Sequence, residues 1–564
     1  MTQRPRQQRD PSWWVLGPAA LISIGILIIA LCLRTLGVRI GRELPPTSGS
    51  GVSSPPREAT PSPTAVPSIW LAPRLPAQVA LPVAQWVAEH PHAGVLSDSA
   101  SEADISMDTR ETPEATLVWE RIYVVAVPYL HPLMNLGSAA LQERWQAPSR
   151  PQDSALWLVD PDALEALTAL LGPQGPGAQV ELVPAQELPQ RAWAAKEALA
   201  FLPFDHLVPR LRPLRIDGHS VLDPQADLSH YPLALRAWAQ GPEGLLSPLI
   251  EAVQRETPKT NRDPNRLGTL ATTGVTALTR MVAWQMDETG NPGYPAREIG
   301  PLLSSADVTH ISHEVPFAAD CAPQKVMSSF CARPTYMETL RLLGADVVEL
   351  TGNHLLDFGP EAMLASLDLY QQEGIRVFGG GRRAEEARRP LIVEVKGTRV
   401  AFLGYNQAGP PQVWSGDDSP GAARFDLEQA REEIALARTQ ADVVIVHVQH
   451  AEAYSVHPGP RQRLDFLALA EAGADIVVGT QAHQPQTIEF HERSLILHGL
   501  GNLIFDQLWS LPTRQSLVAW HVLYDGRHLA TELLPTQMGH DLLPRWLQGA
   551  EAQAVIEEVM TASQ

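Results

Sequence analysis

Four segments of the sequence combine a strand-like run with polar residues that could do chemistry. Each begins with Ala-Asp, continues through β-branched residues and reaches a histidine seven to nine positions later. The segments are "ADVTHISHE" from Ala306, "ADVVELTGNH" from Ala345, "ADVVIVHVQH" from Ala441 and "ADIVVGTQAH" from Ala474. Imidazole, carboxylate and carboxamide groups hold divalent metals such as Mn, Fe or Zn. The pattern indicates a metal site, and a hydrogen-bonded structural role is the alternative for any single histidine.

The elements around these segments must bring their polar ends together. Amphipathic helical stretches such as "RQRLDFLALAEAG" precede the last three segments, and strands that alternate with helices predict a mainly parallel sheet. The carboxyl ends of parallel strands meet at one edge, where open α/β sheets hold their ligands. We therefore expect one crevice, lined by His313, Glu314, Asn353, His354, Gln449, His450 and His483.

Asp357 follows the second of these strand ends in "LTGNHLLDFG", residues 350–359. We expect its carboxylate either to support the neighbouring site residues or to cap a helix that begins near Pro360, because a negative charge is favourable at a helix N-terminus. A plain turn is the alternative for the whole stretch.

Length and composition limit the class to which the protein can belong. A chain of 564 residues is too long for one ordinary core, so it predicts at least two domains. The formal net charge of −20 argues against a nucleic-acid partner, because a phosphate backbone needs a basic surface. Of the three cysteines, Cys32 lies in an apolar run, which leaves Cys321 and Cys331 as a candidate disulfide in an oxidising compartment or as two free thiols.

The N-terminal region predicts a membrane anchor. Trp13 to Leu33 is uncharged and long enough to span a bilayer, whereas a cleaved signal peptide has a shorter apolar region. The short tail with Arg4, Arg6 and Arg9 favours an exported bulk and a single-pass protein of the cell membrane. Composition then divides the chain into a cytoplasmic tail (1–12), the anchor (13–33), a Pro/Ser/Thr-rich tether (34–68), a first domain (69–245), a linker (246–266), a second domain (267–540) and a C-terminal helical tail (541–564).

The first domain alternates strand-like and helical runs, as α/β domains do. Its "YVVAVPYLHPLMNLGSAALQERW" and "ALAFLPFDHLVPRLRPLRIDGHSVLD" loosely resemble the phosphate-type periplasmic solute-binding proteins. About 175 residues are fewer than a full two-lobed binder usually has. The resemblance therefore implies an α/β domain that has lost its ligand.

The second domain resembles the CapA-type proteins of poly-γ-glutamate capsule synthesis. The segments "LTGNHLLDFG", "EAGADIVVGTQAHQPQ" and "HGLGNLIFDQ" carry the resemblance, in the family's order. It implies a layered α/β/β/α fold like that of the calcineurin-like metallophosphoesterases. It also implies that Glu314, Asn353 and His483 are metal-site residues and that His354 is a general acid.

The departures from that family lie in the metal site. The family's opening strand usually ends Gly-Asp, whereas this chain has Thr273 and Gly274 without an acid. Gln449 stands at a family histidine, with His450 beside it, and Thr480 or Gln481 replaces another. The reduced ligand set favours one metal, or none, over a binuclear centre.

These observations predict a membrane-anchored protein that acts in the synthesis, export or anchoring of a cell-surface polymer such as poly-γ-glutamate. As an enzyme it would be a metal-dependent hydrolase with Glu314, Asn353, Gln449, His450 and His483 around Mn, Fe or Zn, and with His354 and Asp357 as the catalytic pair. The alternative is a non-catalytic protein that binds a polymer or an anion. The expected partners are the polymer or its synthesis machinery.

Overall fold

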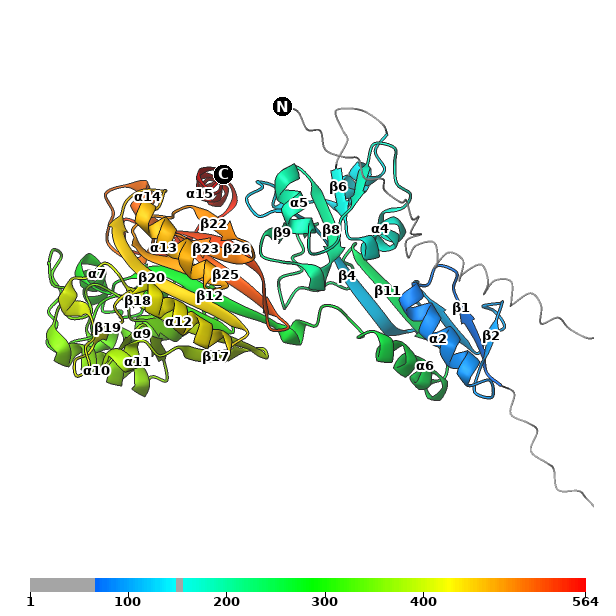
Figure 1. Cartoon of the computed structure of the whole chain (residues 1–564), viewed down its shortest axis with the longest axis horizontal. Coiled ribbons are helices and arrows are strands. Elements are labelled where there is room, and N and C mark those ends of the chain that lie inside the picture. The colour runs from blue at the N-terminus through cyan, green and yellow to red at the C-terminus, as the bar shows by residue number, and fades with distance from the viewer. Residues whose placement is uncertain (1–65, 149–155) are drawn as a thin grey trace, which may run out of the picture. The chain divides into compact units, whose positions relative to one another are not determined.

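The computed structural model describes residues 66–148 and 156–564 (Figure 1). The predicted cytoplasmic tail, the anchor Trp13–Leu33 and the tether up to residue 65 lie outside the described residues. Within the described ranges, no helix is both long enough and apolar enough to cross a bilayer.

The first part of the described chain is built on a mixed nine-stranded sheet in the order β2-β1-β3-β11-β4-β8-β6-β7, with β9 paired to β4. The long strand β4 contributes Val118 and Trp119 to one core and Ile122–Val127 to another, so it connects two packed regions. The strands are β1 (Ser68–Leu71), β2 (Val95–Ser97), β3 (Ile105–Asp108), β4 (Thr116–Pro128), β5 (Asn135–Leu136), β6 (Leu156–Val159), β7 (Gln179–Leu182), β8 (Leu199–Pro203), β9 (Leu211–Pro213), β10 (Arg215–Ile216) and β11 (Ala234–Gln240). The helices are α2 (Ala77–Glu89), α3 (Ser138–Trp145), α4 (Leu164–Leu171), α5 (Leu188–Ala195) and α6 (Glu243–Glu256).

Helix α6 corrects the predicted linker, which began too early at residue 246. Its buried Leu246, Leu249 and Val253 recur at helical spacing and pack into the same core as α2. The polar residues after position 254 led to the prediction of a linker, although the residues before them form an amphipathic helix. The stretch outside helices and strands is therefore the shorter segment 257–263, in which Asn261 and Arg262 are buried. It leads into a short 3₁₀ turn at Pro264–Arg266.

The second part contains two larger sheets. One has eight strands, in the order β15-β14-β13-β12-β25-β26-β27 with β24 on β12, and the other has six, in the order β17-β18-β20-β21-β23-β22. The strands are β12 (Leu267–Thr276), β13 (Val308–His313), β14 (Ala345–Glu349), β15 (Arg376–Phe378), β16 (Gly380–Gly381), β17 (Leu391–Val395), β18 (Thr398–Asn406), β19 (Gly421–Ala422), β20 (Val443–Ala453), β21 (Ile476–Ala482), β22 (Ile488–His491), β23 (Ser494–Leu497), β24 (Asn502–Ile504), β25 (Gln515–Tyr524), β26 (Arg527–Met538) and β27 (Pro544–Trp546). The helices are α7 (Arg280–Thr289), α8 (Gly300–Leu303), α9 (Met337–Leu342), α10 (Gly359–Gln372), α11 (Ala384–Ala387), α12 (Leu427–Arg438), α13 (Pro460–Glu471), α14 (Leu511–Arg514) and α15 (Gly549–Ala562).

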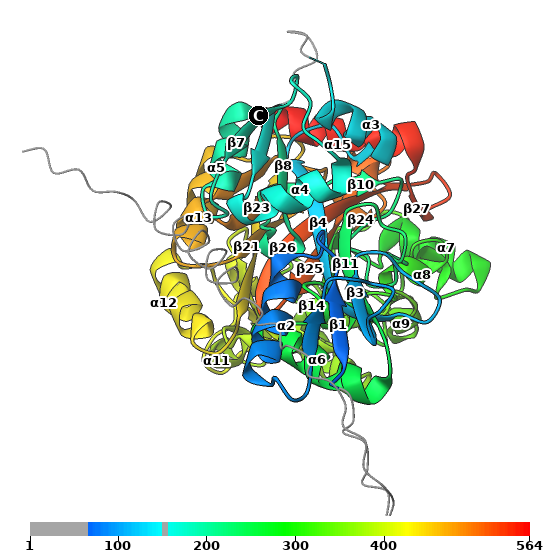
Figure 2. The same ribbon diagram turned by 90° about the vertical axis from the view of Figure 1, so that its right-hand side faces the viewer.

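These elements stack in four layers. One apolar core fills the space between the two sheets, a second lies between the eight-stranded sheet and α7, α9 and α10, and a third lies between the six-stranded sheet and α12 and α13. Figure 2 shows α7 and α9 on the opposite side of the sheets from α12 and α13. Successive strand residues face different layers, since Val347 packs between the sheets and Val348 packs under the helices. The mixed α/β class and the α/β/β/α layering agree with the prediction, and α15 lies in the predicted helical tail.

Candidate functional site

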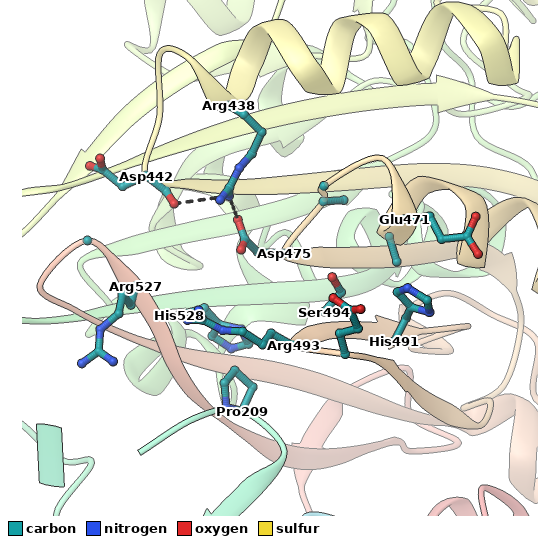
Figure 3. Close-up of a pocket in the computed structure, with 15 residues that line it drawn as sticks. Pro209, Arg438, Asp442, Glu471, Asp475, His491, Arg493, Ser494, Arg527 and His528 are labelled. Carbon is teal, nitrogen blue, oxygen red and sulfur yellow. Dashed lines mark hydrogen bonds and ion pairs between the residues drawn. The ribbon is translucent and has the colours of Figure 1, made fainter. Parts of the chain in front are cut away.

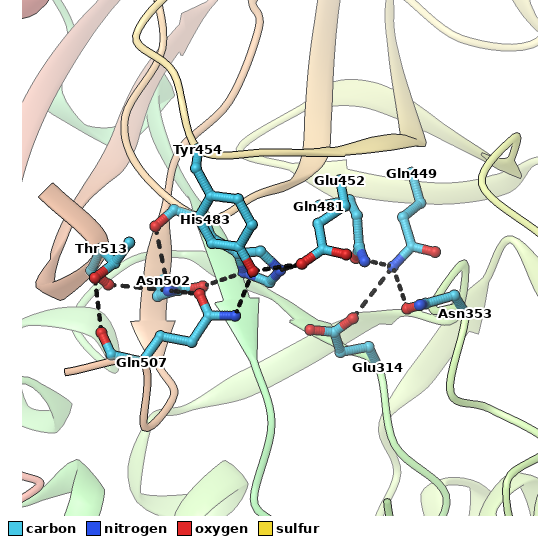
Figure 4. A network of polar contacts seen from close by, with 10 residues as sticks. All are labelled: Glu314, Asn353, Gln449, Glu452, Tyr454, Gln481, His483, Asn502, Gln507 and Thr513. Carbon is cyan, nitrogen blue, oxygen red and sulfur yellow. Dashed lines mark hydrogen bonds and ion pairs between the residues drawn. The ribbon is translucent and has the colours of Figure 1, made fainter. Parts of the chain in front are cut away.

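The carboxyl ends of parallel strands from both sheets meet in a polar cluster, which we call the crevice (Figure 4). Its centre is the side-chain amide of Gln449 on β20. The Nε2 atom lies 3.2 Å from Glu314 Oε2, 3.3 Å from Asn353 Oδ1 and 2.8 Å from Gln481 Oε1. Glu314 follows β13, Asn353 follows β14 and Gln481 lies on β21. Three of the predicted ligands, Glu314, Asn353 and Gln449, therefore do come together, although they span 135 positions of sequence.

The orientation of the Gln449 amide is determined by its neighbour Asn406. Asn406 Oδ1 accepts hydrogen bonds from Gly409 N at 2.7 Å and from Trp414 Nε1 at 2.9 Å, so its Nδ2 must face the other way. That Nδ2 donates to Gln449 Oε1 at 2.8 Å. Gln449 therefore points its NH₂ group, and not its oxygen, at the oxygens of the crevice.

His354 and Asp357 form a hydrogen-bonded pair at the edge of the crevice. His354 Nδ1 donates to Asp357 Oδ2 over 2.7 Å, and the same oxygen accepts from Phe330 N at 2.7 Å. Phe330 stacks on the His354 ring with centroids 4.0 Å apart. Burial opposes the charged imidazole, but the Asp357 hydrogen bond and the charge of Glu314 outweigh it and raise the pKa of His354. Of the two roles expected for Asp357, the structure shows the support of a neighbouring site residue, His354. The N-cap residue of α10 is Phe358 and not Asp357.

Glu314 is the buried acid of the crevice. Its residue is 4% exposed, and this burial raises the pKa of its carboxyl to about 7. The nearby charge of His354 acts in the opposite direction and is the smaller effect. A carboxyl that titrates near neutrality can exchange a proton under ordinary conditions.

His483 lies beside this group and is held by Asn502. Its Nδ1 donates to Asn502 Oδ1 at 2.9 Å, which leaves Nε2 as an acceptor that faces Glu452 Oε1 at 3.7 Å (Figure 4). Burial lowers the pKa of His483, so the neutral ring is favoured. Tyr454 stacks on the ring, with centroids 5.2 Å apart.

His450 and His313 are not part of the crevice, which corrects the prediction for both. His450 Nε2 contacts Asp465 Oδ2 of α13 at 3.2 Å, and His313 Nδ1 contacts the Tyr370 hydroxyl of α10 at 2.8 Å. Both side chains point into the helix layers because adjacent strand residues face opposite sides of a sheet. Gln449, next to His450, and Glu314, next to His313, point to the crevice instead.

The crevice does not fit the predicted metal. A cation at its centre would occupy the position of the Gln449 NH₂ group, which already satisfies the surrounding oxygens. The missing acid cannot be supplied at Gly274 either, because a Cβ there would lie 2.1 Å from the Gly501 carbonyl oxygen. In the part of the chain that the structure describes, the one group of three His, Cys, Asp or Glu residues close enough to share an ion lies elsewhere, at His310, Glu349 and His447.

His310, Glu349 and His447, which we call the buried triad, were missed by the sequence reasoning. Each interrupts a β-branched run and lies on the strand face that points between the sheets. Val308, Val347 and Ile445, two positions earlier on the respective strands, lie on the same face. The signal was present in the sequence as a polar residue in the middle of an apolar strand.

A surface pocket of about 510 Å³ lies at the opposite, amino ends of the six-stranded sheet (Figure 3). Arg438 pairs there with Asp475, and Arg399 pairs with Asp442 at 2.8 Å. These charges neutralise one another in pairs. Arg493, Glu471 and His491 also line this pocket (Figure 3).

Comparison with known proteins finds relatives of the region that contains the crevice. Residues 269–507 match the family model described as "Bacterial capsule synthesis protein PGA_cap". The chain is 25% identical over 285 residues to the "Capsule biosynthesis protein CapA" of Bacillus anthracis, which covers 49% of this chain and 69% of that protein. It is 28% identical over 191 residues to the "PGA biosynthesis protein CapA" of Bacillus subtilis (strain 168), which covers 34% of this chain and only half of that protein.

Solved structures align at low scores. A 5'-nucleotidase precursor from Thermus thermophilus aligns with a TM-score of 0.31 and 14% identity, covering 52% of this chain and 58% of that one. An ABC-type phosphate transport receptor from Vibrio cholerae aligns with a TM-score of 0.24 and 12% identity, covering 33% of this chain and 93% of that one. The family relationship accordingly rests on the sequence matches: the C-terminal region of this chain, residues 269–507, is similar to the CapA-type family of bacterial capsule-synthesis proteins.

Proposed function

We propose that this chain acts in the synthesis, export or anchoring of a cell-surface polymer of the poly-γ-glutamate type, and that its crevice binds the polymer without metal-dependent chemistry. The match of residues 269–507 to the capsule-synthesis family model and the names of the two Bacillus relatives support the polymer class. The α/β/β/α layering supports a metallophosphoesterase-like fold for this region. The proposal takes up the non-catalytic alternative of the sequence analysis.

The observation that carries this proposal is the orientation of the Gln449 amide. An NH₂ group with three oxygen acceptors within 3.3 Å takes the place that a cation would need. Asn406 holds that orientation, so a metal could enter only after two amides had turned. A protein that lost its metal in this way keeps a cluster of carboxamide, carboxyl and imidazole groups.

Those groups match the chemistry of a polyamide with acidic side groups. Gln481 and Asn353, which Gln449 orients, can exchange hydrogen bonds with peptide groups, and a protonated His354 offers a positive charge to a carboxylate. At the rim, Tyr454 and Trp509 are 46% and 63% exposed and their rings lie 5.9 Å apart. Exposed aromatic rings beside a polar pocket are typical of binding surfaces.

A second candidate function is hydrolysis by acid–base chemistry. The raised pKa of His354 and the pKa of about 7 of Glu314 favour it. The Glu314 carboxylate would take a proton from water, the hydroxide would add to an amide carbon, and the carbon–nitrogen bond would break as His354 protonated the leaving nitrogen. No metal enters that scheme.

Binding and turnover of a fluorescent poly-γ-glutamate fragment by the purified chain, with and without EDTA, distinguish these functions. We expect binding that EDTA does not change and that Gln449→Ala weakens, while the exposed control Gln371→Ala on α10 leaves it unchanged. New amine termini that disappear in His354→Ala would establish the second candidate. Turnover that EDTA abolishes would overturn both.

We also propose that the chain beyond the predicted anchor lies outside the cytoplasmic membrane. The arginines of the short N-terminal tail support this orientation. External protease on intact spheroplasts should remove both domains. Protection of the second domain would reverse the orientation.

A further inference from the structure

We propose that the buried triad, His310, Glu349 and His447, binds one divalent metal ion of the zinc type between the two sheets. This site is separate from the crevice, and the proposal does not depend on the function proposed above. It assigns a metal site to residues in the core of the domain.

The position of the triad suits an ion that joins the two sheets. His310 on β13 and Glu349 on β14 belong to the eight-stranded sheet, whereas His447 on β20 belongs to the six-stranded sheet. Their side chains are fully buried, and the rings of Phe378 and Phe402 pack around them. An ion bound to all three would therefore link the sheets through their shared core.

The spacing of the donor atoms fits one small ion. His310 Nε2 lies 3.4 Å and His447 Nδ1 lies 3.1 Å from the same carboxylate oxygen, Glu349 Oε2. The three ligand atoms lie within 4.8 Å of one another. Zinc–nitrogen and zinc–oxygen bonds of about 2.0 to 2.2 Å in a tetrahedral site place neighbouring donors roughly 3.3 Å apart.

These same atoms lack hydrogen-bond partners. In the described ranges, His310 Nε2, Glu349 Oε2 and both ring nitrogens of His447 are buried without a contact of hydrogen-bond geometry. The other carboxylate oxygen, Oε1, accepts from the hydroxyls of Thr351 and Thr480. The unsatisfied valences therefore converge on one point, and buried polar groups are rarely left in that state.

An ion-free triad would have to share protons instead. In that state the contact of 3.4 Å from Thr273 N to His310 Nδ1 would leave the His310 proton on Nε2. Metal binding through Nε2 requires that proton to move to Nδ1, so the Thr273 contact must lengthen. The two states thus differ in metal content and in the His310 tautomer.

Two imidazoles and one carboxylate select for zinc and similar ions over magnesium and calcium, which prefer oxygen ligands. The site has no exposed side chain, so a substrate cannot reach it. We therefore assign the ion a structural role.

Crystals of the chain refolded with Zn²⁺ test the site directly. The purified full chain is unfolded in denaturant with a chelator and refolded with or without Zn²⁺, and anomalous-difference density is measured at the zinc absorption edge. We expect a peak between the three side chains and a higher midpoint of thermal unfolding in the zinc-refolded protein. Absence of a peak at the triad, including a map with zinc only at the crevice or the surface, would overturn the proposal.

Variants give a second measurement in solution. His447→Gln should lose one zinc per chain, whereas His521→Gln, which changes another buried histidine of the eight-stranded sheet, should retain it. Gln449→Ala in the crevice should also retain the zinc, which separates this site from the proposed function. Zinc retained at full occupancy by His447→Gln would overturn the proposal, and the wild-type anomalous map decides if that variant does not fold.

Discussion

Gln449 Nε2 donates a hydrogen bond of 3.2 Å to Glu314 Oε2 and so joins the two sheets at the crevice. Glu314 follows a strand of the eight-stranded sheet, and Gln449 lies on the six-stranded sheet. The bond is buried, so each partner depends on the other for its hydrogen-bonding. An amide donor in this position replaces a metal ion as the group that holds the oxygens together.

Replacement of Gln449 by leucine should therefore destabilise the domain. Glu314, Asn353 and Gln481 would each lose a buried donor, and a buried polar group left unsatisfied costs about 1–3 kcal/mol. We expect the free energy of unfolding to fall by at least that amount in urea titrations. The exposed variant Gln371→Leu is the control, and an equal loss in both variants would contradict the role of Gln449.

The raised pKa of Glu314 predicts a pH dependence of stability. The folded carboxyl holds its proton up to about pH 7, whereas the unfolded one releases it near its ordinary value, so the folded state binds more protons in between. Stability should thus fall as the pH rises from about 4.5 to 7. Glu314→Gln should remove this decline, on the order of 1–3 kcal/mol. The assignment would be contradicted if the free energy of unfolding changed with pH by the same amount in both proteins across this range.

Asp357 should control the protonation of His354. The hydrogen bond between them raises the pKa of His354, so Asp357→Asn should lower it towards or below the ordinary value. The ring-proton NMR signal of His354, assigned with His354→Ala, measures the titration directly. Asp368→Asn on the same helix region is the control, because Asp368 pairs with Arg382 at the surface. An unchanged titration in Asp357→Asn would show that burial and Glu314 alone set the pKa.

Cys321 and Cys331 form a disulfide with Cα atoms 5.9 Å apart, and we expect it to position Phe330 against His354. Closing a loop of this length stabilises a folded domain by roughly 2–3 kcal/mol in the chain-entropy model. Cys321→Ser with Cys331→Ser should lower the free energy of unfolding by that amount and broaden the His354 NMR signal. Reductant should do the same to the wild type and nothing to the double variant.

Particular residues show how far the sequence alone could lead. The β-branched runs and their helical neighbours predicted parallel strands, and parallel strands of one sheet place Glu314 and Asn353 at the same edge. The motifs around Asn353 and His483 predicted the family. The helix over Glu243–Glu256 was missed because its apolar positions are diluted by polar neighbours, and only its packing against α2 shows that it is formed.

The tertiary structure decided what a pattern of residue types could not. Neighbouring strand residues face opposite layers. Whether His450 or Gln449 points into the crevice therefore depends on which face of the sheet each one occupies. Whether Gln449 offers an oxygen or an NH₂ group depends on Asn406, 43 positions away, and that choice separates a metal ligand from a metal substitute. The buried triad likewise exists only because two sheets stack face to face. The sequence by itself determined which side chains were available at each strand, and the packing of one sheet on the other determined which of them meet.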